Sequence, residues 1–150
     1  MVMHEDVERI LISEQELDAK VSELAEKISR DYAGKTVLVV TLLKGGVMFA
    51  VDLMRKLTVP VEIDFMSVSS YGASSKSSGI VKVDKDLDNS IKGKDVLLVE
   101  DIIDSGLTLN YVREMLLGRE PASLKICTIL DKPSRRKTQV AVDYTGFEIP

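Results

Sequence analysis

The sequence predicts an α/β domain with a mainly parallel central sheet and helices on both of its faces. The runs "TVLVVTLL" (36–43) and "KDVLLVE" (94–100) are almost continuously apolar, as in strands that are covered on both sides. Segments typical of strands and of helices alternate along the chain, which indicates right-handed crossovers between parallel strands. The chain has 150 residues, with no repeat and no interior linker, so we expect a single domain.

The elements follow in order. A helix is expected after Ser13, which has capping-box spacing to Glu16, and Gly34 provides a stop signal. A strand over 36–43 leads through "KGG" to a helix over about 47–57, and a second strand covers 61–70. The small polar stretch "YGASSKSSG" (71–79) predicts a mobile loop. A short strand is expected over 80–87. A further buried strand, "KDVLLVE", is followed by a helix over about 106–117. Two more strands are expected over 123–130 and 140–149.

The overall composition argues against several classes of function. A net charge of −4 and a pI near 5.1 disfavour general binding to nucleic acids or to anionic membranes. No apolar run approaches the roughly 20 residues of a membrane helix, and the N-terminus lacks a secretory signal pattern. The single cysteine, Cys127, excludes an internal disulfide and suits the cytoplasm. The single histidine, His4, argues against a histidine-based triad or a multi-histidine zinc site.

Three segments that carry charged residues or glycines each follow a predicted strand. They are "LLKGG", "VEDIIDSG" and "LDKPSRRK". Ligands of parallel sheets bind beyond the carboxyl ends of the strands, so these segments are expected to meet at one edge. The meeting of all three segments is stronger evidence for a ligand-binding site than any one segment alone.

The segment "VEDIIDSGLT" clusters three carboxylates where folding alone would leave neutral residues. Glu100 and Asp101 can accept hydrogen bonds from vicinal sugar hydroxyls or hold a hard divalent cation, and a solvated surface pair is the alternative. The turn over 105–108 enters a helix, so its N–H groups can cup a phosphate. Equally, Asp104 or Ser105 can simply cap that helix.

The other two segments are basic. In "LKGG", Lys44 and two glycines can bind a second anionic group, although an ordinary strand-to-helix turn is favoured when the segment is judged alone. Lys132 directly follows a strand and can donate to a carbonyl acceptor, and a nearby arginine can pair with phosphate. A basic surface loop is the ordinary alternative. Together the segments suit a ligand with phosphates, magnesium and a polar base.

The stretch "VLLVEDIIDSGLTL" resembles the phosphoribosyl-diphosphate signature of type I phosphoribosyltransferases. With "LLKGG", "SSYGASSKSSG", "LKICTILDKPSRRK" and "VDYTGFEIP", the chain resembles bacterial hypoxanthine (hypoxanthine-guanine) phosphoribosyltransferases from about Glu5 onward. The resemblance implies the type I phosphoribosyltransferase fold with a small hood over the base. It also implies a magnesium-dependent enzyme that forms homodimers or homotetramers. The net charge of −4 predicts no nucleic-acid or membrane partner.

The resemblance assigns roles to individual residues. Asp104 is implied as the general acid or base at the purine N7, and Lys132 as donor to the purine 6-oxo group. Ribose hydroxyls and magnesium are assigned to Glu100 and Asp101. Residues implied to bind the phosphate groups of 5-phosphoribosyl 1-diphosphate are Ser105, Gly106, Leu107, Thr108 and Leu109 at the 5′-phosphate, and Lys44, Gly45 and Arg136 at the pyrophosphate. The family often builds the Lys44 loop with a non-proline cis peptide, and Ser70 and Tyr71 are implied to begin a lid.

The implied reaction is purine salvage, with transfer of the phosphoribosyl group to N9 of hypoxanthine or guanine. A xanthine-preferring relative is one alternative. Another is a nucleotide-sensing regulator of the pyrimidine-operon attenuator type, which needs a basic RNA-binding face that the net charge of −4 does not support. The family continues past "GFEIP" with a segment that contacts the purine, so we expect the hood to be incomplete in a chain that ends at Pro150.

Overall fold

The computed structural model describes residues 12–70 and 80–150. Within these residues the helices and strands follow the predicted order, apart from one short 3-10 helix, η1, that the sequence did not indicate. In chain order they are α1 (Glu14–Asp31), β1 (Val37–Leu42), α2 (Val47–Lys56), β2 (Val61–Ser70), β3 (Val81–Lys85), β4 (Asp95–Ile103), α4 (Leu107–Leu117), β5 (Ser123–Asp131), η1 (Pro133–Arg135) and β6 (Tyr144–Glu148).

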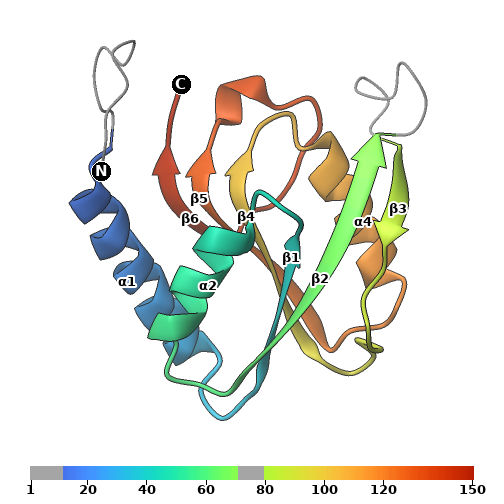
Figure 1. Ribbon diagram of the computed structural model, residues 1–150, viewed down its shortest axis with the longest axis horizontal. Coiled ribbons are helices and arrows are strands. Elements are labelled where there is room, and N and C mark those ends of the chain that lie inside the picture. The colour runs from blue at the N-terminus through green and yellow to red at the C-terminus, as the bar shows by residue number, and fades with distance from the viewer. Residues whose placement is uncertain (1–11, 71–79) are drawn as a thin grey trace.

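The strands form one six-stranded sheet in the order β3-β2-β1-β4-β5-β6 (Figure 1). Only β3 is antiparallel to its neighbour, and the other four pairs are parallel. The predicted mainly parallel sheet is therefore confirmed. Because β1, β4 and β5 are adjacent and parallel, their carboxyl ends lie side by side at one edge of the sheet.

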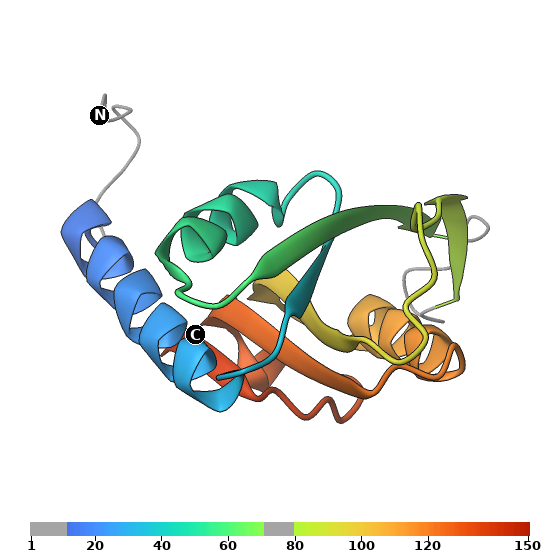
Figure 2. The same cartoon turned by 90° about the horizontal axis from the view of Figure 1, so that it is seen from below.

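Helices cover both faces of the sheet, as the apolar strands predict. The helices α1 and α2 pack on one face, and α4 packs on the other (Figures 1 and 2). Neighbouring residues of β1 alternate between the two cores, with Val39 in one and Val40 in the other. The capping box that begins α1 is also confirmed, since Ser13 Oγ accepts from the Glu16 N–H at 3.1 Å and Glu16 Oε1 accepts from the Ser13 N–H at 3.2 Å.

Strand β4 is longer than the sequence predicted. It continues past Glu100 to Ile103 because β5 provides backbone partners along this stretch, among them Thr128 for Glu100 and Asp131 for Ile103. The acidic pair therefore belongs to the strand itself. The last strand is shorter than predicted and begins only at Tyr144.

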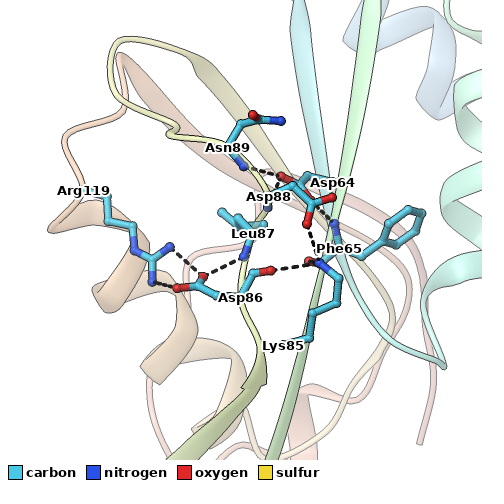
Figure 3. Close-up of polar contacts among 8 residues, drawn as sticks. All are labelled: Asp64, Phe65, Lys85, Asp86, Leu87, Asp88, Asn89 and Arg119. Carbon is cyan, nitrogen blue, oxygen red and sulfur yellow. Dashed lines mark hydrogen bonds and ion pairs between the residues drawn. The ribbon is translucent and has the colours of Figure 1, made fainter.

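A buried carboxylate shapes the chain after β3 (Figure 3). Asp64, on β2 and only 5% exposed, accepts from the backbone N–H groups of Phe65, Asp88 and Asn89 at 2.8, 2.9 and 3.4 Å. Beside it, Asp86 forms a bidentate pair with Arg119, which follows α4. These contacts hold the segment after β3 against β2 and against the residue Arg119 that follows α4.

Candidate active site

The loop between β1 and α2 lies directly against the acidic end of β4. The peptide bond between Leu43 and Lys44 is cis, as the family resemblance implied. A Cβ placed on Gly46 would collide with Thr41 Oγ1 and lie 3.1 Å from Glu100 Oε1. A Cβ on Gly45 would lie 3.5 Å from the Asp101 carboxylate. The two glycines thus allow the loop to approach the acidic pair closely.

Glu100 and Asp101, near the carboxyl end of β4, differ in environment. Burial, and secondarily the charge of Asp101, raises the pKa of Glu100 to about 8. Asp101 Oδ1 accepts from the Ile102 N–H at 2.8 Å. A bound cation would relieve the repulsion between the two groups. The described residues contain no cluster of three or more His, Cys, Asp or Glu side chains that could hold a metal.

The turn after β4 forms an open anion-sized pocket of about 170 Å³. Gly106 is the N-cap of α4 with φ of +81° and has no side chain to cap the helix. Ser105 Oγ accepts from the N–H of Leu107, the first residue of α4, at 3.3 Å, so the capping alternative holds in part for Ser105. Gly106 is suited to this left-handed conformation because it lacks a Cβ. The pocket brings together six of the predicted site residues: Glu100, Asp104, Ser105, Gly106, Thr108 and Leu109.

The segment after β5 lies against the same turn. Its Arg135 places Nε 3.3 Å from Asp104 Oδ1, and the Asp104 side chain is half-exposed. Lys132 donates its backbone N–H to the Ile103 carbonyl at 2.9 Å. Arg136, which is expected near the pyrophosphate, donates to Asp131 Oδ1 at 2.7 Å and to the Asp104 carbonyl at 3.1 Å.

Sequence reasoning did not single out two residues that support this site. Thr41 is fully buried and donates from Oγ1 to the Val99 carbonyl at 3.0 Å, beneath Gly46. Asp131 is buried at the end of β5. A charged residue that ends an otherwise apolar strand was the available signal for Asp131, whereas Thr41 gave none. Ser70 ends β2, and Tyr71 lies outside the described residues.

The family model described as "Phosphoribosyl transferase domain" matches residues 7–150. The chain belongs to the phosphoribosyl transferase family. It is 48% identical over 149 residues to a hypoxanthine-guanine phosphoribosyltransferase of Bacillus subtilis, and the match covers 99% of this chain and 83% of that protein. It is 52% identical over 144 residues to a hypoxanthine phosphoribosyltransferase of Haemophilus influenzae, covering 94% of this chain and 80% of the relative.

Solved structures of phosphoribosyltransferases share the fold. A hypoxanthine phosphoribosyltransferase of Staphylococcus aureus matches with a TM-score of 0.95 and 43% identity, over 100% of this chain and 82% of its own. A hypoxanthine-guanine phosphoribosyltransferase of Bacillus anthracis, with a HEPES molecule in its active site, matches with a TM-score of 0.93 and 48% identity over 97% of this chain and 86% of its own. The resemblance noted in the sequence is thus confirmed. No helix within residues 12–70 and 80–150 has the length and apolar character to cross a membrane.

Proposed function

We propose that this phosphoribosyltransferase acts in purine salvage. It transfers the 5-phosphoribosyl group from 5-phosphoribosyl 1-diphosphate to N9 of hypoxanthine or guanine, and the products are IMP or GMP and pyrophosphate. Relatives that carry these names at 48% and 52% identity are the observation on which this proposal rests. The meeting of an acidic pair, a phosphate-sized pocket and two lysine-bearing loops at one edge of the sheet supports it.

Within this function, the turn after β4 binds the sugar phosphate. Residues 105–109 hold the 5′-phosphate through backbone N–H groups and hydroxyls at the start of α4. Glu100 and Asp101 hold the ribose hydroxyls. Asp104 exchanges a proton with the purine N7, a role that suits its half-exposed carboxylate.

The neighbouring loops bind the two other parts of the substrates. Lys44 and Gly45 bind the pyrophosphate, and the Lys44 ammonium offsets the negative charge that develops as it leaves. Lys132 donates to the purine 6-oxo group. The lid that begins at Ser70 and Tyr71 and the small hood over the base remain predictions. The pyrophosphate contact expected of Arg136 competes with its bonds to Asp131 and to the Asp104 carbonyl and is not part of this proposal.

Magnesium is the proposed cofactor, with Glu100 and Asp101 as its protein ligands. The pKa of Glu100, which burial and secondarily the charge of Asp101 raise, fits a site that gains from a cation. When bound, Mg²⁺ supplies positive charge that stabilises the departing pyrophosphate.

Assembly and location are part of the same proposal. We expect a homodimer or homotetramer, with small-molecule substrates and without nucleic-acid or membrane partners. The single cysteine, Cys127, is buried, and a cytoplasmic location accords with it.

A spectrophotometric assay of the full-length protein tests the function. Hypoxanthine, guanine, xanthine and uracil are each supplied with 5-phosphoribosyl 1-diphosphate and Mg²⁺. Turnover of hypoxanthine or guanine is expected. Preferential turnover of xanthine would change the assigned base, and turnover of uracil alone would contradict purine salvage.

A further inference from the structure

Two backbone hydrogen bonds join the segment after β5 to the turn after β4. Lys132 donates its N–H to the Ile103 carbonyl at 2.9 Å, and Lys137 donates to the Ser105 carbonyl at 2.8 Å. The two bonds lie at opposite ends of the segment 132–137. The loop that carries Lys132, the proposed purine donor, is therefore attached at both ends to the turn that carries Asp104, the proposed acid–base group.

The Arg136 side chain makes a third link between the same two segments. Its Nη1 donates to the Asp104 carbonyl at 3.1 Å, and its Nη2 donates to Asp131 Oδ1 at 2.7 Å. Its Cδ would be 3.0 Å from a Cβ on Gly106, so the arginine lies tightly over the start of α4. One guanidinium thus spans the end of β5 and the turn after β4, with each terminal nitrogen bound to a different segment.

Burial distinguishes this ion pair from its neighbour. The side chains of Arg136 and Asp131 are 15% and 7% exposed, whereas those of Arg135 and Asp104 are 62% and 50% exposed. An exposed pair contributes about 0–1 kcal/mol. Removing one partner of a buried pair leaves an uncompensated charge, so the remaining group must move or draw in water. The position of Arg136 therefore depends on Asp131.

We propose that Asp131 and Arg136 are a positioning pair that holds Lys132 and Asp104 in register for one purine. The inference rests on the proposed function, in which Lys132 contacts the 6-oxo group and Asp104 exchanges a proton with N7. These two atoms are close neighbours on the purine ring. Their protein partners come from different loops, and a displacement of about 1 Å at such a site costs up to roughly 100-fold in rate.

Single and double variants test the pair. Asp131→Val removes the acceptor at nearly constant volume, Arg136→Gln removes the charge, and Arg136→Lys keeps the charge but loses the planar fork that reaches two acceptors. We expect each to lower kcat by about 10- to 100-fold and to raise the KM for the purine, with the KM for 5-phosphoribosyl 1-diphosphate little changed. The kcat of the double variant Asp131→Val/Arg136→Gln is expected to fall no further than that of either single variant, because both substitutions break the same ion pair.

Asp18→Asn is the matched control, since it weakens an ion pair of the same 2.7 Å length, with Lys56, between α1 and α2. It is expected to leave the kinetic constants unchanged. A large rise in the KM for 5-phosphoribosyl 1-diphosphate in Arg136→Gln, with Asp131→Val unaffected, would overturn the proposal and make Arg136 a substrate ligand. Wild-type turnover by Arg136→Lys would also overturn it.

Amide hydrogen exchange provides a measurement that does not need activity. Faster exchange at Lys132 and Lys137 is expected in the Asp131 and Arg136 variants and not in Asp18→Asn. Unchanged exchange at both amides in Asp131→Val would overturn the positioning pair. Absence of purine turnover by the unaltered protein would instead overturn the proposed function, so the two failures are distinguishable.

Discussion

At the scale of single residues, the three carboxylates at the site occupy different environments. Glu100 is largely removed from water, Asp101 accepts from a neighbouring backbone N–H, and the Asp104 side chain is half-exposed beside Arg135. Only the last of these is accessible to a bound base and also lies beside a cationic side chain. This difference is the physical basis for assigning proton exchange to Asp104 and sugar or cation binding to the other two.

Asp104→Asn tests that assignment. An amide cannot exchange the proton, so kcat should fall by about 10²- to 10⁴-fold. Binding of 5-phosphoribosyl 1-diphosphate should be largely retained, because the phosphate turn is built from backbone groups. Steady-state kinetics and calorimetric binding measure the two effects, with Asp88→Asn, whose carboxylate is 73% exposed beside Lys85, as control. Wild-type turnover in Asp104→Asn would exclude this residue from proton transfer.

The raised pKa of Glu100 predicts a pH-dependent stability in metal-free protein. The folded state holds this proton up to a pKa of about 8, whereas the unfolded chain releases it near 4.5. The folded state thus binds more protons between these values, so this contribution is complete below pH 4.5 and is lost as pH rises towards 8. The unfolding free energy of the wild type should therefore fall relative to Glu100→Gln across this range, in urea titrations with a chelator present. A constant difference between the two proteins would contradict the prediction.

At the scale of elements, the loop after β1 depends on one glycine more than on the other. A Cβ on Gly46 meets Thr41 Oγ1 and lies 3.2 Å from the Val99 carbonyl oxygen, and neither group is free to move within the buried sheet. A Cβ on Gly45 makes only ordinary contacts, at 3.5 Å, with the Asp101 carboxylate. The loop after β1 can therefore pack closely on β4 because residue 46 is a glycine.

Gly46→Ala should accordingly destabilise the fold, by about 1–3 kcal/mol from overpacking. Gly45→Ala is the matched control and should change the unfolding free energy much less. Chemical denaturation of both variants measures the difference. Equal stability of the two variants would show that the loop can move away from β4 at little cost.

At the scale of the whole molecule, the site is assembled from three segments that follow three adjacent strands. The order β1-β4-β5 places the glycine loop, the acidic turn and the basic segment next to one another. Within the described residues the acidic pair has no third metal-ligating side chain close enough to complete a metal site. Mg²⁺ is usually bound by one or two carboxylates together with substrate phosphates, so we expect it to bind to Glu100 and Asp101 mainly when the substrate is present.

This dependence predicts how ligands shift thermal stability. Mg²⁺ with 5-phosphoribosyl 1-diphosphate should raise Tm clearly, since a ligand at 100 times its Kd stabilises the folded state by about 2.7 kcal/mol. Mg²⁺ alone should raise Tm little, and the double variant Glu100→Gln/Asp101→Asn should lose most of the combined effect. Differential scanning fluorimetry is sufficient for the comparison. An equal rise with Mg²⁺ alone would indicate a preformed metal site.

The sequence by itself determined the features that arise from near neighbours along the chain. The capping box at Ser13 and the apolar strands follow from local patterns, since periodicity and capping act over a few residues. The meeting of the three charged segments at one sheet edge was expected from a parallel sheet, and the strand order β1-β4-β5 makes them neighbours. The resemblance carried by "VEDIIDSGLT" added the family. Tertiary structure decided what depends on distant partners. Pairing with β5 extends β4 through Asp101, and Thr41 reaches the Val99 carbonyl 58 residues away. The buried Asp131 takes up the guanidinium of Arg136, because a charge removed from water needs a partner and the fold provides that one.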